Sequence, residues 1–215
     1  MSESRTLVVF GATGRTGREL VAQALEAGHH VRAAVRRPQA VLLEHPRLTT
    51  LAVDVLAHGV DEAVSGADAV LSALGSPDGR RPTDVYSGGT RAIVEAIRRA
   101  GVRRLLTISA APVRPATETP LPERVLLHPV LGLFFGEIYD DMRRMEEELG
   151  TIADLDWTVV RPPYLTDGPA TGRWRTAIEA RLPRAQSIRR ADLAAAMLHM
   201  LDDPATFGKA VNVAH

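Results

Sequence analysis

The chain of 215 residues contains no cysteine, and Lys209 is the single lysine among its 26 basic residues. The lack of cysteine excludes disulfides, thiolate nucleophiles and cysteine-ligated metals. It also fits a reducing compartment, so we expect a cytoplasmic protein. Any mechanism that needs a catalytic lysine must use Lys209, close to the C-terminal end.

The chain also lacks a net charge, a metal-binding histidine pattern and a long apolar run. The 26 acidic residues balance the 26 basic ones, which argues against partners such as nucleic acid or a membrane surface. The seven histidines show no metal-binding spacing, so we expect no metal site. The longest apolar stretch, Val125 to Phe135, contains Pro129 and Gly132 and is too short to span a bilayer. We expect it to roof a pocket or to form a dimer contact, so monomer and homodimer both remain open.

A glycine-rich loop near the N-terminus is the most informative motif. The apolar run from Leu7 to Phe10 leads directly into Gly11, Gly14 and Gly17, and a helical pattern follows. This run is too short for the core of a secretory signal. The first glycine permits a tight turn, the second lets the backbone approach a pyrophosphate, and the third lets helix and strand pack closely. With the intervening Thr13, Arg15 and Thr16, the loop predicts a dinucleotide site at a helix N-terminus.

Strand-like and helix-like segments alternate along the chain. The predicted strands are residues 6–10, 30–35, 48–53, 67–73, 104–109, 157–160 and 210–213, with a short extended piece near Trp174. The predicted helices are about residues 15–27, 60–65, 83–100, 137–149 and 192–201. This order predicts an α/β fold of the Rossmann type, a doubly wound parallel sheet with helices on both faces. We expect residues 1–215 to form a single domain, with acceptor-site elements from about 110–140 and 161–185.

The candidate site residues gather at one edge of the predicted sheet. Ligands of such sheets bind beyond the carboxyl ends of the strands. The residues at those ends are Gly11, Arg36, Asp54, Leu74, Gly75, Ser109 and the stretch Pro162 to Tyr164. We expect Asp54 and Val55 to meet the adenine, and Leu74 and Gly75 to pass the nicotinamide-side ribose.

The end of the second strand predicts the cofactor. An NAD site usually places a carboxylate there, about 20 residues beyond the glycine loop. This chain has Arg36 and Arg37 instead, and a guanidinium can pair bidentately with a 2′-phosphate. Arg15 could add a second cation, so NADPH is the expected cofactor.

These motifs resemble an atypical short-chain dehydrogenase/reductase, in particular the type of biliverdin reductase B and NADPH-flavin reductase, with NmrA-like relatives. The similarity extends over almost the whole chain, from GATGRTG through the TISA segment and RPPYLTDGPATG to the SIRRADLAAAMLHML helix. The resemblance implies that Ser109 lies beside the nicotinamide, that Pro163 helps to wall it, and that Tyr164 takes a position often held by histidine. The chain departs from that type in a longer, more apolar loop from Pro112 to Ile138. It also departs near Met142, where a histidine expected on the following helix is replaced. Both changes touch the acceptor pocket, so the substrate of that type does not carry over.

Three hydroxyl groups are candidates for the chemistry. Ser109 and Tyr164 could orient the nicotinamide or donate a hydrogen bond, or could only satisfy backbone and pack. Tyr139 and Arg143 form a Tyr-x-x-x-Arg stripe in which Arg143 could stand in for the lysine of conventional short-chain dehydrogenases, although a guanidinium shuttles protons poorly. Alternatively, Tyr139 lies at the edge of the core. We expect the run from Glu146 to Glu148 to be solvated, with Arg143 and Arg144 as its partners.

The sequence therefore favours an NADPH-dependent reductase that passes hydride to a flavin, a quinone-like molecule or another conjugated small-molecule acceptor. For such acceptors charge delocalises into the rings, so a flat apolar slot over the nicotinamide is the main requirement. Flavin is then a substrate. The alternatives are an NADP(H)-binding sensor without efficient turnover and a pathway-specific carbonyl reductase or isomerase.

Overall fold

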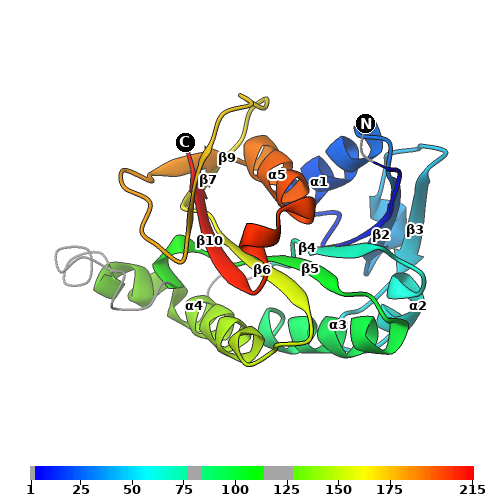
Figure 1. Ribbon diagram of the computed structural model, residues 1–215, viewed down its shortest axis with the longest axis horizontal. Helices are drawn as coiled ribbons and strands as arrows, with labels where there is room; N and C mark the ends of the chain where they lie inside the picture. The colour runs from blue at the N-terminus through cyan, green and yellow to red at the C-terminus, as the bar shows by residue number, and fades with distance from the viewer. Residues whose placement is uncertain (1–2, 77–83, 114–127) are drawn as a thin grey trace.

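An eight-stranded sheet with helices on both faces forms the centre of the molecule (Figure 1). A computed structural model describes residues 3–76, 84–113 and 128–215, and for residues 128–135 it describes the backbone alone. The strand order is β3-β2-β1-β4-β5-β6-β10-β8. This order reverses next to β1, where two halves wind in opposite directions, as in the Rossmann fold.

Seven strands of the sheet are parallel. They are β1 (Thr6–Phe10), β2 (His30–Val35), β3 (Leu48–Ala52), β4 (Ala69–Ser72), β5 (Arg104–Ile108), β6 (Asp156–Arg161) and β10 (Lys209–Ala214). The central strands β4 and β5 are buried along their whole length, which explains their unbroken apolar character.

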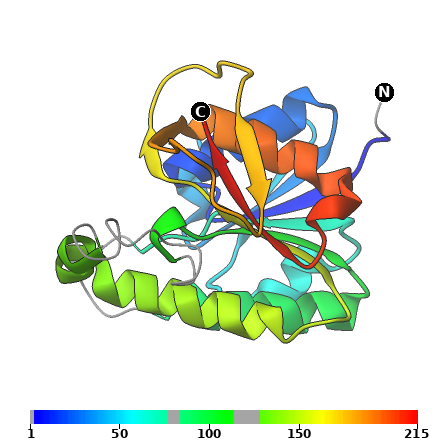
Figure 2. The same ribbon diagram turned by 60° about the vertical axis from the view of Figure 1, so that its left-hand side comes forward.

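Five α-helices cover the sheet in two layers. They are α1 (Arg15–Glu26), α2 (Val60–Val64), α3 (Ser87–Ala100), α4 (His128–Gly150) and α5 (Arg190–His199). Helices α1 and α5 lie on one face, and α2, α3 and α4 lie on the other (Figures 1 and 2). Four short 3₁₀ turns complete the described helices, at Pro38–Ala40, Ala111–Val113, Met200–Asp202 and Pro204–Thr206.

Most predicted elements are confirmed to within a few residues. The predicted apolar face of the first helix is also confirmed, because Gly17, Leu20, Val21, Ala24 and Leu25 are its buried residues. The doubly wound α/β fold is therefore the one that the alternation predicts.

The predicted loop from Pro112 to Ile138 is wrong over its last part, because α4 already begins at His128. The apolar stretch Val125 to Phe135 is consequently helical in backbone from His128 onward. Residues 125–127, and the side chains of 128–135, lie outside the described part of the chain, so the expected roof or dimer contact stays a prediction.

The C-terminal part of the sheet also differs from the prediction of purely parallel strands. The extended piece near Trp174 is β8 (Arg175–Ile178), which pairs antiparallel with β10 at the sheet edge. Two further strands, β7 (Tyr164–Thr166) and β9 (Ser187–Arg189), form a small parallel sheet of their own. Strand β7 follows the carboxyl end of β6 and lines the site described next. None of the described helices is long and apolar enough to cross a membrane.

Candidate active site

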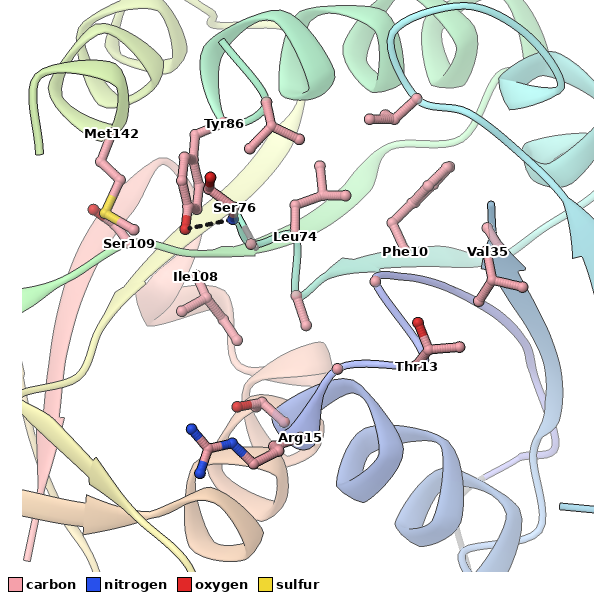
Figure 3. Close-up of a pocket in the computed structure, with 18 of the residues that line it drawn as sticks. Phe10, Thr13, Arg15, Val35, Leu74, Ser76, Tyr86, Ile108, Ser109 and Met142 are labelled. Carbon is pink, nitrogen blue, oxygen red and sulfur yellow. Dashed lines mark hydrogen bonds between the residues drawn. The ribbon is translucent and has the colours of Figure 1, made fainter. Parts of the chain in front are cut away.

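A cleft of about 870 Å³ runs across the carboxyl ends of β1, β2, β3, β4 and β5. The predicted cofactor residues that line it are Gly11, Thr13, Gly14, Arg15, Thr16, Arg36, Asp54, Val55, Leu74, Gly75, Ser109 and Pro163. Figure 3 shows its two ends, with Val35 at one and Ser109 and Met142 at the other. The structure thus brings together at one edge side chains that are up to 152 residues apart.

The three glycines of the loop have distinct structural roles. Gly11 has a φ of +73°, and a Cβ on it would lie 2.3 Å from the carbonyl oxygen of Ala73. A Cβ on Gly17 would lie 2.2 Å from the carbonyl oxygen of Gly11, so Gly17 sets the packing of α1 against the loop and does not line the cleft. A Cβ on Gly14 would meet protein only at 3.2 Å, and Gly14 is exposed in the cleft. Its lack of a side chain therefore leaves room for a ligand.

The N-terminus of α1 is built to receive an anion. Gly14 is the N-cap, no side chain caps the helix, and its first turn contains no acidic residue. The backbone N–H groups and the helix dipole therefore attract a phosphate placed here. Arg15, in that first turn, donates from Nη1 to Oδ2 of Asp167 at 3.0 Å.

The two arginines after β2 lie differently. Arg36 is exposed and lines the cleft, and it forms no hydrogen bond or ion pair with any residue that the structure describes. Arg37 is exposed too but does not line the cleft. On the facing side, Asp54 Oδ1 accepts a hydrogen bond from the backbone N–H of Leu56 at 3.1 Å, which orients its carboxylate beside Val55.

Ser109 stands at the other end of the cleft. It follows β5, is 3% exposed, and its Oγ has no hydrogen-bond partner in the described structure, although its backbone N–H donates to Val160. A buried hydroxyl without a partner costs free energy unless a ligand supplies one. With the open Gly14 and the uncapped α1, this hydroxyl indicates that the cleft fits a dinucleotide.

Tyr86 and Met142 also line this end of the cleft. The sequence analysis expected the change near Met142 to touch the acceptor pocket, but it missed Tyr86 as a site residue. The hydroxyl oxygen of Tyr86 accepts a hydrogen bond from the backbone N–H of Ser76 at 3.4 Å (Figure 3). Burial raises the pKa of Tyr86, and the nearby Asp141 raises it further. The phenol therefore stays protonated at neutral pH. The sequence predicted a helix from residue 83, which would place Tyr86 inside it. In the structure α3 begins at Ser87, so Tyr86 lies just before the first turn of the helix.

A second cavity, of about 1010 Å³, adjoins the cleft. The residues that line both are Arg15, Ala110, Pro162, Pro163, Leu165 and Arg190. Tyr139 and Tyr164 line only this second cavity, and Tyr164 is 76% exposed. Tyr164 therefore lies apart from the cofactor cleft, at the mouth of the adjoining space. We refer to this space as the acceptor cavity.

The expected stripe of Tyr139 and Arg143 is present on α4, but Arg143 pairs with Asp140 on the exposed surface. Burial raises the pKa of Tyr139, and the neighbouring Tyr86 raises it further. The surroundings of Tyr139 therefore hold it as a neutral hydroxyl and make it a weaker proton donor than a free tyrosine.

The prediction for the acidic run at residues 146–148 is wrong for Glu146 and for the arginine partners, whereas Glu147 is exposed as expected. Arg143 and Arg144 pair with Asp140 and Asp141 instead. Glu146 forms a largely buried ion pair with Arg161, whose Nε lies 3.0 Å from Oε2 of Glu146. Glu148 pairs with Arg91 of α3. Glu146 and Glu148 reach neighbouring elements because α4 packs beside α3 on one face of the sheet.

The described residues contain no cluster of three or more histidine, aspartate or glutamate side chains that could hold a metal ion. The polar groups of the cleft are hydroxyls, backbone amides, guanidinium groups and the carboxylate of Asp54. These groups suit phosphates and sugar hydroxyls.

Fold and cleft together define a dinucleotide-binding protein of the Rossmann class. The chain belongs to the NAD(P)H-binding family, whose model matches residues 11–204. This match supports the expected resemblance to the atypical short-chain dehydrogenases and their NmrA-like relatives.

Relatives and solved structures agree with this assignment. The uncharacterised protein YwnB of Bacillus subtilis is 27% identical over 207 residues, which cover 91% of this chain and 92% of YwnB. A protein from Burkholderia pseudomallei has a crystal structure with a TM-score of 0.82 and 26% identity, covering 98% of this chain and 100% of that one. A short-chain dehydrogenase/reductase from Veillonella parvula, solved in complex with NADP, has a TM-score of 0.78 at 20% identity, covering 99% and 95%. At 20% identity, the similarity to this last structure shows a shared fold alone.

Proposed function

We propose that the protein is an NADPH-dependent reductase that passes hydride to a conjugated small-molecule acceptor such as a flavin or a quinone. The observation that carries this proposal is the junction of the cofactor cleft with the acceptor cavity, where Pro162, Pro163 and Ala110 line both spaces. A reduced nicotinamide bound in the cleft supplies the hydride. Its transfer needs the acceptor atom about 3–3.5 Å away in a space that excludes water, and flat apolar walls favour a planar acceptor.

The residues of the chain bind the cofactor and orient it. The N–H groups at the start of α1 hold the pyrophosphate, and Ser109 Oγ hydrogen-bonds the carboxamide or ribose of the nicotinamide half. Arg36, which lacks a partner among the described residues, pairs with a 2′-phosphate, and this contact selects NADPH over NADH.

The state of the tyrosines supports an acceptor that needs no strong acid or base from the enzyme. Tyr86 and Tyr139 both have a raised pKa, and Arg143 is turned to Asp140. A ketone requires a proton donor at the developing alkoxide, whereas flavins and quinones take protons from solvent. A flavin-like or quinone-like acceptor is therefore favoured over a simple carbonyl.

The pairing of Arg143 with Asp140 also favours one second candidate, an NADP(H)-binding sensor that responds to cofactor state without efficient turnover. Arg143, the cation that shares a helix face with Tyr139, is engaged by Asp140, so the Tyr-x-x-x-Arg stripe does not form the acid–base pair of the usual short-chain dehydrogenases.

Steady-state oxidation of NADPH with riboflavin, FMN, dichlorophenolindophenol and a short-chain quinone separates the two. We expect turnover with at least one acceptor, and slower turnover when NADH replaces NADPH. Calorimetry supplies the second measurement. Tight NADPH binding with no oxidation above the rate without protein would contradict the reductase and favour the sensor, and no binding at millimolar cofactor would contradict both.

A further inference from the structure

The first turn of α3 packs closely against the wall of the cofactor cleft. Gly89 lies in this turn, and a Cβ on it would be 3.0 Å from Cδ1 of Leu74 and 3.1 Å from Cγ1 of Val55. Leu74 and Val55 both line the cleft. A larger residue at position 89 would push the helix away from them, because protein interiors leave little free space. The glycine therefore allows Tyr86, which directly precedes the helix, to reach the cleft.

The side chain of Tyr86 extends from the start of α3 into the cleft (Figure 3). Tyr86 is 7% exposed, and its hydroxyl oxygen would lie 3.9 Å from a Cβ on Gly75. The same oxygen accepts the hydrogen bond from the backbone N–H of Ser76. The phenol thus packs against the turn that follows β4, at the end of the cleft where the Ser109 hydroxyl has no partner among the described residues.

The Tyr86 hydroxyl can still donate a hydrogen bond. A phenol both donates and accepts, and the bond from Ser76 uses its oxygen as an acceptor. None of the described residues accepts the phenolic proton. A buried donor without an acceptor costs free energy, and an oxygen of a ligand would remove that cost. Together with Ser109, Tyr86 presents two buried hydroxyls to the part of a ligand that binds at this end.

We propose that Tyr86 orients the cofactor by donating a hydrogen bond to an oxygen of its nicotinamide riboside half. This oxygen belongs either to the carboxamide or to a ribose hydroxyl. Burial raises the pKa of Tyr86, so the phenol keeps its proton and only positions the nicotinamide. The inference rests on the nicotinamide cofactor of the proposed function, but it depends neither on the acceptor nor on turnover.

Two ligands that share an adenosine half test the role of Tyr86. NADP⁺ carries the nicotinamide riboside and 2′,5′-ADP lacks it, so the ratio of their affinities, measured by calorimetry, isolates the contacts of the nicotinamide half. In Tyr86→Phe, NADP⁺ should bind about tenfold more weakly, as for the loss of one buried hydrogen bond, whereas 2′,5′-ADP should bind as before. Tyr164→Phe is the matched control, because this hydroxyl lies outside the cofactor cleft and its loss should change neither affinity.

A fluorinated side chain separates donation to the cofactor from support of the turn at Ser76. In 3-fluorotyrosine, introduced in place of Tyr86, the fluorine withdraws electrons and makes the O–H a stronger donor and its oxygen a weaker acceptor. If the phenol donates to the cofactor, NADP⁺ should bind about twofold more tightly at about pH 6, where the phenol is protonated. If it only accepts from Ser76, NADP⁺ should bind more weakly.

The thionicotinamide analogue of NADP⁺ distinguishes the two oxygens, because sulfur accepts hydrogen bonds weakly. If Tyr86→Phe does not weaken binding of this analogue, the carboxamide oxygen is the partner. If it weakens binding as much as for NADP⁺, a ribose hydroxyl is the partner.

The inference is overturned if Tyr86→Phe binds NADP⁺ as tightly as the unchanged protein, if it loses as much affinity for 2′,5′-ADP, or if the fluorinated protein binds NADP⁺ more weakly. The melting temperature of each variant is measured alongside. A protein that shows the expected ratios but oxidises no NADPH would contradict the reductase and leave the role of Tyr86 standing. If the unchanged protein binds no NADP⁺, both proposals fail.

Discussion

The carboxylate of Asp141, in the middle of α4, accepts hydrogen bonds from the backbone N–H groups of Tyr86 at 2.9 Å and Ser87 at 3.3 Å. It also accepts one from the Ser87 hydroxyl. Asp141 is fully buried and therefore caps the start of α3 from a different helix. This contact fixes the residue whose phenol lines the cofactor cleft. The position of Tyr86 is thus decided by a carboxylate 55 residues away in the sequence.

Replacing Asp141 with Ala should lower the free energy of unfolding by about 2 kcal/mol or more, because two buried N–H groups at the start of α3 lose their acceptor. Urea unfolding followed by circular dichroism measures the change. Asp140→Ala is the control, since Asp140 makes only an exposed ion pair with Arg143 and should change stability by less than about 0.5 kcal/mol. Equal effects of the two substitutions would argue against the capping role.

Ser109→Ala tests the candidate hydroxyl of the site. We expect kcat/KM with NADPH to fall about tenfold, as for the loss of one hydrogen bond to a bound cofactor. The free energy of unfolding should stay equal or rise slightly, because the hydroxyl has no partner in the described structure. Ser72→Ala makes the same change at another buried and unpartnered hydroxyl, on β4 and outside the cleft. If Ser72→Ala lowers kcat/KM as much, Ser109 has no special role.

Arg36→Asp tests the choice of cofactor. The substitution removes a guanidinium from the cleft and places a carboxylate near the expected 2′-phosphate, so KM for NADPH should rise by about a hundredfold. KM for NADH should stay the same or fall. Arg37→Asp serves as the comparison, because Arg37 does not line the cleft, and its effect should be much smaller. An unchanged ratio of the two KM values in Arg36→Asp would end the assignment of Arg36.

Asp192 should make stability dependent on pH. Burial favours the neutral carboxyl, but hydrogen bonds from His215, Thr171 and Gly172 outweigh burial and lower the pKa of Asp192 below 3.8. A carboxyl whose pKa is lower in the folded than in the unfolded state stabilises the fold above the unfolded pKa. The contribution disappears as the pH falls through the folded pKa.

Asp192→Asn should therefore cost about 2 kcal/mol at pH 7, and the difference from the unmodified protein should shrink below pH 3.8. Unfolding by urea across this pH range measures it. Asp202→Asn is the control, as Asp202 forms an exposed ion pair with Arg5 and should show little effect. A difference that stays constant across the range would contradict a role for the charge of Asp192.

Local signals in the sequence predicted the fold and one half of the site. The run from Leu7 to Gly17 predicted a strand, a turn and a helix, and each is confirmed within one residue of its expected bounds. The rule that ligands bind beyond the carboxyl ends of parallel strands then placed Asp54, Leu74 and Ser109 at one edge, and all three line the cleft.

The predictions that failed concern elements whose environment is set by distant partners. The run at residues 146–148 reads as a solvated helix face, yet Glu146 is held by Arg161 of β6. Strand β8 is a short strand without a clear alternating pattern, and it runs antiparallel because it returns along the free edge of β10. No short-range pattern encodes either contact.

Local patterns along the chain specify a Rossmann-type sheet with a glycine-rich loop after its first strand. Glycine spacing and apolar periodicity act over a few residues, and those short distances suffice to specify the loop and the alternation of elements. The packing of distant elements decides which side chains meet at the far end of the cleft and in the acceptor cavity. Tyr86, Ser109, Asp141 and Tyr164 come from separate elements, and their positions depend on how helices and strands pack over long separations in the chain.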